Sequence, residues 1–293
     1  MHRTKLTMLA LLGTMLSASA AKQNALRDYR AVPPSDSLAP SEQNSPAYLG
    51  FDRNDYPGDD ALASLRKTFA FAGYWLNAPP GETSDSWKGK REILRAHGFG
   101  FLVLFNGRLD KELKAPRDAK RIGANDAQIA VAAAQAEDFP RGAIIFVDQE
   151  EGGRMLPEQR EYLYAWIDGV NAAGYRAGVY CSGMPDKPGA GGVITADDIR
   201  VNAGARQIAF FVYNDACPPS PGCIFSARQL AVPTSGVASA TIWQIAQSPR
   251  RKNITARCRA TYATDGNCDP PGLAAQGIYV DVDVARSPNP SGG

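Results

Sequence analysis

The stretch Ile144-Ile145-Phe146-Val147-Asp148-Gln149-Glu150 lies near the middle of the chain and guides the interpretation of the rest. Four apolar residues run into acidic ones and then into Gly152-Gly153, a pattern typical of a buried strand that ends at a turn. Because side chains alternate along a strand, Asp148 and Glu150 are expected to project to the same side. The sequence therefore predicts two carboxyl groups at the end of one buried strand.

Paired carboxyl groups are what glycoside hydrolysis requires, one protonated as general acid and one ionised. Close like charges separate the pKa values of the two groups and so allow both states to exist together. The plainer interpretation of Asp148 and Glu150 is a solvated acidic strand end that caps the following turn. Both interpretations stay open until the rest of the chain is considered.

The histidine count excludes several mechanisms. The chain contains His2 and His97 alone, and His2 lies in a segment that we expect to be removed. His97 precedes Gly98 at a predicted helix C-terminus, where a histidine is usually structural. A Ser-His-Asp or Cys-His mechanism is therefore disfavoured, and carboxyl groups remain as the acid–base groups.

Strand-like and helix-like segments alternate along the chain. Strands are predicted over residues 48–52, 69–76, 100–106, 143–150, 176–182, 207–214, 241–246 and 278–284, and helices over residues 59–67, 86–96, 125–138, 157–173 and 196–204. This alternation predicts an α/β fold, a (β/α)8 TIM-like barrel that becomes irregular in its last third. An open doubly wound sheet is the alternative fold.

The N-terminus has the pattern of an export signal. Basic residues, a short apolar stretch and small residues follow one another over residues 1–21, which we expect to be a secretory signal peptide. Without Arg3 and Lys5 the 32 basic residues fall to 30, equal to the 30 acidic ones, so no electrostatic case for nucleic acid or an anionic membrane remains. The predicted organisation is a signal peptide (1–21), a flexible leader (22–47), the barrel (48–288) and a tail (289–293), in a secreted periplasmic or extracellular protein.

The cysteines fit an exported chain. We expect two short disulfide loops, one joining Cys217 to Cys223 and the other joining Cys258 to Cys268. Cys181 ends an apolar run and is expected to be a buried free thiol. No Cys-x-x-Cys or His-x-x-x-His spacing occurs, so no metal site is predicted.

A barrel would gather its acids at one end. Strand C-termini face the active site in this fold, and Asp52 closes the first predicted strand while Asp148 and Glu150 close the fourth. Asp281 lies in the eighth predicted strand and is expected at the same mouth. Asp283 is expected to face elsewhere.

The chain resembles the glycoside-hydrolase-like domains of unknown function that are related to family 25 lysozymes. The similar segments are Leu49-Gly50-Phe51-Asp52, Val147-Asp148-Gln149-Glu150, Ala177-Gly178-Val179-Tyr180, Ile242-Trp243-Gln244 and Val280-Asp281-Val282-Asp283, in the family's order. The resemblance implies that Glu150 is the general acid, Asp148 its partner, and Asp52 and Asp281 flanking acids of the pocket.

The resemblance also implies a sugar groove. Tyr180 and Trp243 would line it, since aromatic rings stack on the apolar faces of sugars, with Gln244 and Glu151 as further substrate-binding residues. Trp243 could equally be a core residue. Glu151 and the following glycine pair depart from the lysozyme pattern, so either Glu150 or Glu151 could face the pocket.

The function implied is an exported glycoside hydrolase of amino-sugar polymers, with peptidoglycan cleaved in the manner of an N-acetylmuramidase. Asp148 could attack directly or orient the substrate's acetamido oxygen as nucleophile, and we favour the assisted route. The alternative is a catalytically inactive barrel that binds cell-wall carbohydrate. No cofactor is implied, and the expected partner is a polysaccharide bound by a monomer without a membrane span.

Overall fold

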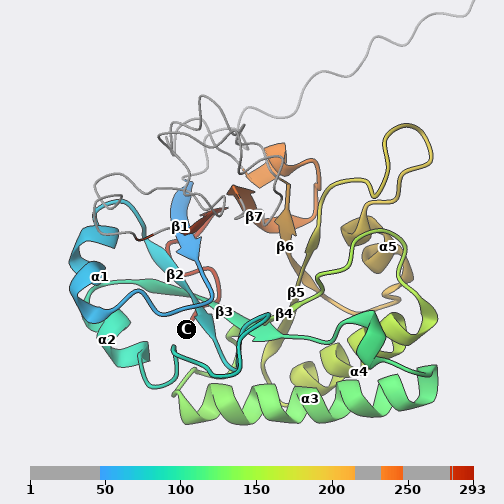
Figure 1. Cartoon of the computed structure of the whole chain (residues 1–293), viewed down its shortest axis with the longest axis horizontal. Helices are drawn as coiled ribbons and strands as arrows, with labels where there is room; N and C mark the ends of the chain where they lie inside the picture. Colours follow the sequence, from blue (N-terminus) through green and yellow to red (C-terminus); the bar gives the residue numbers. More distant parts are fainter. Residues whose placement is uncertain (1–46, 215–231, 247–277, 279) are drawn as a thin grey trace, which may run out of the picture. The chain divides into compact units, whose positions relative to one another are not determined.

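The computed structural model describes residues 47–214, 232–246, 278 and 280–293. Eight strands close into a barrel in the order of the sequence (Figure 1). The strands are β1 (Tyr48–Asp52), β2 (Phe71–Trp75), β3 (Gly100–Asn106), β4 (Ile144–Asp148), β5 (Arg176–Ser182), β6 (Ala209–Tyr213), β7 (Ala240–Ala246) and β8 (Asp281–Ala285). The barrel prediction is confirmed, and the open doubly wound sheet is wrong because β1 and β8 pair and leave no free edge.

The last strand runs against the others. Neighbouring strands from β1 to β7 are parallel, whereas β8 is antiparallel to both β7 and β1. The regular (β/α)8 repeat is therefore broken in the last third, as predicted. The reversal brings the first residue of β8, Asp281, to the end of the barrel where the other strands finish, opposite Asp52.

Helices lie outside the strands in Figure 1. They are α1 (Asp59–Leu65), α2 (Arg91–Ala96), α3 (Pro116–Ala136), α4 (Pro157–Ala172) and α5 (Thr195–Asn202), with short 3₁₀ turns η1 (Asp110–Glu112) and η2 (Val232–Ser235). Helix α3 begins nine residues before the predicted start, because Pro116 occupies the first helical turn, where its missing N–H costs nothing.

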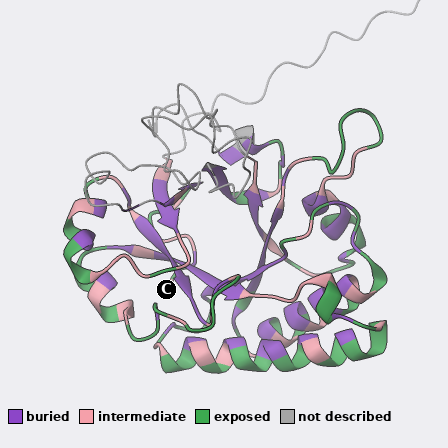
Figure 2. Cartoon of the chain, viewed as in Figure 1, coloured by how far each residue is buried: buried purple, intermediate pink, exposed green. Residues whose placement is uncertain are grey.

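The core lies inside the barrel and between the barrel and its helices (Figure 2). All five residues of β2 and of β4 are buried, as expected for parallel strands covered on both faces. Within the barrel the ring of Phe211 packs against Phe146 and Tyr180, at centroid distances of 6.1 and 4.7 Å. Aromatic side chains thus pack directly beneath the level of the predicted acids.

Residues 289–293, predicted to be a tail, pack against the barrel instead. Ser291 is 1% exposed, and its hydroxyl accepts a hydrogen bond from the backbone N–H of Val103 at 2.8 Å. Its carbonyl accepts from the N–H of Ile144 at 2.8 Å, and Asn289 Oδ1 accepts from the N–H of Phe101. This segment therefore supplies backbone partners for β3 and β4.

Several predictions lie outside the described residues. They are the signal peptide, the leader and the four cysteines expected in disulfides. Cys181 is a buried free thiol, as predicted, and burial raises the pKa of that thiol. All described residues belong to one compact unit, Ser41–Gly293. In this part of the chain, no helix combines the length and apolar character needed to cross a membrane.

Candidate functional site

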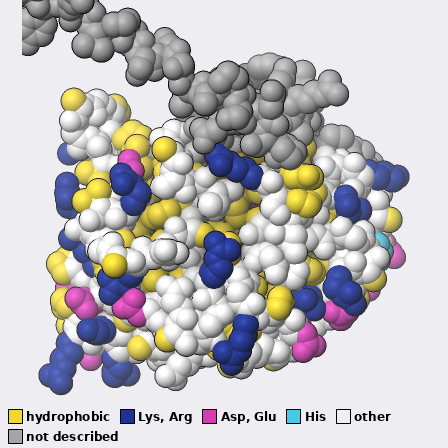
Figure 3. Space-filling model, turned by 180° about the vertical axis from the view of Figure 1, so that it is seen from behind, with side chains coloured by type: hydrophobic (Ala, Val, Ile, Leu, Met, Phe, Trp, Pro, Cys, Tyr) yellow, Lys and Arg dark blue, Asp and Glu magenta, His cyan; other side chains and the backbone are white. Residues whose placement is uncertain are grey.

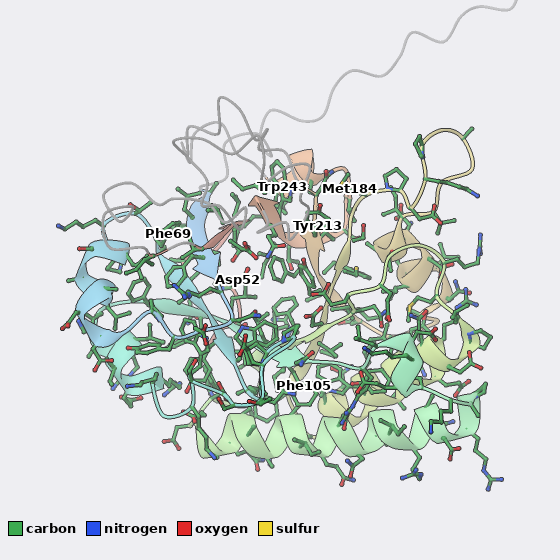
Figure 4. All side chains as sticks on the ribbon, viewed as in Figure 1. Asp52, Phe69, Phe105, Met184, Tyr213 and Trp243 are labelled. Carbon is green, nitrogen blue, oxygen red and sulfur yellow. The ribbon has the colours of Figure 1, made fainter. Side chains whose placement is uncertain are left out.

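A polar layer lies at the end of the barrel where the parallel strands finish. Asp52 ends β1, Asp148 ends β4, Tyr180 stands opposite Asp148 on β5, and Gln244 lies near the end of β7. Figure 4 shows Asp52 within the ring of strands. Asp52, Asp148 and Gln244 are between 3% and 7% exposed, so this layer forms the floor of the site and is screened from solvent.

Tyr180 connects this layer. Its hydroxyl donates to Gln244 Oε1 at 2.8 Å, and the Gln244 amide donates to Asp52 Oδ2 at 2.8 Å. Burial raises the pKa of Tyr180 well above its ordinary value, and four carboxyl groups raise it further, those of Glu150, Asp148, Asp52 and Asp281. The charges of all four acids predicted from the sequence therefore act on one hydroxyl group.

The side chains of Asp148 and Glu150 interact with each other. Burial raises the pKa of Asp148 well above its usual range, and the nearby Glu150 raises it further through its charge and a hydrogen bond between the side chains. Two carboxyl groups can share a hydrogen bond only when one carries a proton. Asp148 is 6% exposed whereas Glu150 is exposed to solvent beyond the end of β4, so the proton resides on Asp148.

The pKa of Asp52 is also raised, but less than that of Asp148. Burial raises the pKa of Asp52 from 3.8 to about 6, while hydrogen bonds with Gln244 and Asp283 lower it and the charge of Glu150 raises it. The Asp52 carboxyl thus titrates in mildly acidic medium. It can ionise under conditions in which Asp148 keeps its proton.

Glu151 is held by the protein. One of its oxygens accepts from the backbone N–H of Asp110 at 2.7 Å, and the other accepts from the amide of Gln159 at 3.1 Å. These bonds join the loop after β4 to η1 and to α4. Of the two candidates that the sequence left open, Glu150 is exposed and Glu151 is engaged in anchoring the loop.

The glycine pair shapes the same loop. Gly153 has a φ of 92°, a conformation that favours glycine, and its N–H donates to Thr195 Oγ1 at 2.7 Å in a buried position. Thr195 begins α5, which follows β5. The departure from the lysozyme pattern noted in the sequence therefore packs the loop that carries Glu150 against the next strand–helix unit.

Trp243 is not placed beside the acids. It neighbours the inward-facing Gln244, so it points to the opposite face of β7, where it is 3% exposed and its indole N–H donates to the carbonyl of Asn214 at 2.8 Å. In this structure Trp243 packs in the barrel wall, which was the alternative left open in the sequence. Gln244 and Tyr180 form the floor of the site.

Two residues of the site were not predicted. Tyr213 is half-buried at the end of β6, two residues beyond Phe211 and opposite Gln244 (Figure 4). Asp283 is fully buried and stands opposite Gln244, and the expectation that it faces elsewhere was wrong. The signal was present, because residues two apart in a strand share a face and Asp281 was already assigned to the mouth.

The described residues contain no group of three or more His, Cys, Asp or Glu side chains arranged to hold a metal ion. On the face seen in Figure 3, lysine and arginine side chains are dispersed. The acids already described place carboxyl groups at the barrel mouth. This arrangement can transfer protons and can stabilise positive charge.

The chain is thus an α/β barrel with two interacting carboxyl groups at the end of β4. Residues 87–195 match the family model of the Rv2525c-like, glycoside hydrolase-like domain, and this match confirms the resemblance predicted from the sequence. The matched segment includes Asp148, Glu150 and Tyr180. No curated protein matches the chain.

Three solved structures illustrate what the chain is similar to. An uncharacterized B. stearothermophilus protein has a TM-score of 0.48 and 17% identity, covering 81% of this chain and 95% of that one. The Tat-secreted protein Rv2525c of Mycobacterium tuberculosis has a TM-score of 0.48 and 14% identity, and the match covers 82% of this chain and 94% of that one. The spore cortex lytic enzyme SleM of Clostridium perfringens has a TM-score of 0.49 and 13% identity, and the match covers 82% of this chain and 68% of that one. The fold assignment of this chain rests on its own strand pairing.

Proposed function

We propose that this protein is a glycoside hydrolase that acts on amino-sugar polymers, with peptidoglycan as its substrate. The observation that carries the proposal is the Asp148–Glu150 pair, in which a buried carboxyl group with a raised pKa adjoins an exposed carboxyl group. The match of residues 87–195 to a glycoside hydrolase-like domain supports the substrate class. The choice of peptidoglycan rests on the sequence resemblance to family 25 lysozymes.

Glu150 serves as the general acid in this proposal, because its exposure lets it reach a polysaccharide. The pair passes its proton from Asp148 to Glu150, and Glu150 gives it to the leaving glycosidic oxygen as the C–O bond breaks. Asp148, now ionised, orients the acetamido group whose oxygen attacks the anomeric carbon. Ionised Glu150 then takes a proton from water, and the resulting hydroxide adds to the anomeric carbon as the bond from that carbon to the acetamido oxygen breaks, which restores the sugar with retention.

The remaining acids support the charge that develops on the sugar. An oxocarbenium-like transition state is positive, so ionised Asp52, with Asp281 opposite it, stabilises this state from β1 and β8. Tyr213 lies on the inward face at the end of β6, where its ring can pack against a sugar.

We further propose that the protein is exported and meets its substrate in the cell wall, as the pattern of residues 1–21 indicates. The decisive experiment incubates purified protein with purified peptidoglycan and identifies released muropeptides by mass. Fragments with reducing N-acetylmuramic acid ends are expected, and Glu150→Gln should release none. Binding to peptidoglycan without release would instead support the inactive carbohydrate-binding alternative.

A further inference from the structure

Asp283 is buried in the barrel without an obvious stabilising partner. It is fully buried, and neither carboxyl oxygen accepts a hydrogen bond from an N–H or a neutral hydroxyl in the described structure. An ionised carboxylate in such a place would lose its hydration without compensation. The carboxyl group must therefore be neutral, or be stabilised by its immediate neighbours.

Those neighbours are acids and an amide. On β8 itself the nearest charged group is Asp281, on β1 it is Asp52, and β7 contributes the neutral Gln244 opposite Asp283. The described sequences of β1, β7 and β8 contain no lysine, arginine or histidine. Across the barrel, Tyr180 is also neutral. No cation from these strands can compensate a negative charge on Asp283.

Asp283 pairs with Gly50, two residues before Asp52 on the same face of β1, so the two carboxyl groups adjoin, and a hydrogen bond between them requires a proton on one of them. Gln244 donates to Asp52 Oδ2, so Asp52 is the better-stabilised anion. Burial and the charge of Asp52 together raise the pKa of Asp283 well above its ordinary value. Asp283 is thus the donor and Asp52 the acceptor.

We propose that Asp283 is a positioning residue, whose neutral carboxyl group donates a hydrogen bond to Asp52 and completes the chain from Tyr180 through Gln244 to Asp52. The proposal rests on the proposed function, because it acts on the reaction through Asp52. Two donors, Gln244 and Asp283, hold the Asp52 carboxylate in place and favour its ionised form. Without the second donor, Asp52 should ionise at higher pH.

The activity test compares two variants of the purified protein on peptidoglycan over pH 4 to 8. Asp283→Asn keeps a neutral donor, so kcat should stay within about twofold of wild type and the acidic limb of the profile should not move. Asp283→Leu removes the donor, and the acidic limb should shift upward by about one pH unit, with kcat lowered about tenfold. If the acidic limb of the Asp283→Leu profile coincides with that of wild type, the proposal is overturned. It is also overturned if Asp283→Asn lowers kcat as much as Asp283→Leu does.

A second measurement needs no activity and serves if Asp283→Leu fails to fold. When folding raises the pKa of an acid, the protein loses stability as pH rises above the pKa of that acid in the unfolded state. Asp283→Asn should therefore have the same melting temperature as wild type near pH 4 and a higher melting temperature than wild type at pH 7. Asp126 is equally buried but bonded to Arg108, so Asp126→Asn should melt below wild type at pH 7. Equal melting of Asp283→Asn and wild type at every pH overturns the neutral donor.

The two hypotheses fail separately. Wild type that releases no muropeptides overturns the proposed function and the positioning role with it, even where the melting series shows a neutral Asp283. If wild type hydrolyses peptidoglycan but neither Asp283 substitution moves the acidic limb of the pH profile or the melting temperature, the positioning role alone is overturned.

Discussion

Gln244 on β7 donates a hydrogen bond to Asp52 on β1 at 2.8 Å, although 192 residues separate them in sequence. The two strands are not neighbours, since β8 pairs with both and lies between them. The bond therefore crosses the inside of the barrel at the level of the acids. The bond depends on barrel closure, and it joins β7 to β1 at the floor of the site.

Glu150→Gln should abolish turnover while leaving the fold intact. The amide keeps the shape of the side chain but carries no proton to donate, and a general acid contributes roughly 100-fold or more to the rate. The measurement is muropeptide release by mass spectrometry, with circular dichroism to confirm folding. Glu151→Gln is the matched control, which should keep most activity but lower the melting temperature, because Glu151 accepts from Asp110 and Gln159. The reverse pattern would show that Glu151 is the acid.

Asp52→Asn should alter the pH dependence of stability. Because folding raises the pKa of Asp52 from 3.8 to about 6, wild type loses about 3 kcal/mol of stability as pH rises from below 4 to above 6. The variant cannot ionise there, so its melting temperature relative to wild type should rise over that window in thermal melts.

Asp59→Asn is the control for this series. Asp59 is exposed and its hydrogen bond from Tyr56 lowers its pKa, so its contribution is already present above pH 4.5. The difference between Asp59→Asn and wild type should be small and constant from pH 4.5 to 7.5. A parallel rise in both variants would contradict the assignment of the effect to Asp52.

Gly123→Ala should destabilise the protein, although alanine is the better helix former. In an exposed helix this change would stabilise by about 1 kcal/mol. Here a methyl group at position 123 of α3 would collide with the backbone carbonyl of Tyr162 on α4, and overpacking costs about 1–3 kcal/mol. Chemical denaturation measures the difference, and Gln128→Ala, on the exposed face of the same helix, should be nearly neutral. A gain in stability for Gly123→Ala would disprove the close packing of α3 on α4.

Ser291→Ala should weaken the barrel from a position that the sequence assigned to a tail. The change leaves the N–H of Val103 on β3 without its acceptor, at a cost of about 1–3 kcal/mol for a buried group. Ser287→Ala is the control, since that hydroxyl accepts from Asn289 in a half-buried place and its loss should cost about 1 kcal/mol or less. Equal unfolding midpoints for both variants would argue against the packed C-terminal segment.

The sequence by itself determined the class of fold and the main acids. The bounds of β1, β3 and β5 were predicted as observed, because apolar runs that end in turn residues encode buried strands locally. Asp52, Asp148 and Glu150 were assigned to one mouth because parallel strands end at the same edge. Neither inference needs contacts between distant residues.

Only the tertiary structure decided the direction of β8, the face of Trp243 and the roles of Glu151 and Asp283. An alternating strand has the same pattern in either direction, so the sequence does not reveal that β8 runs antiparallel. Glu150 and Glu151 are adjacent acids, and they differ only because Asp110 and Gln159 reach one of them. The protonation of Asp283 likewise follows from burial next to Asp52, since a pKa depends on surroundings that the closed barrel alone creates.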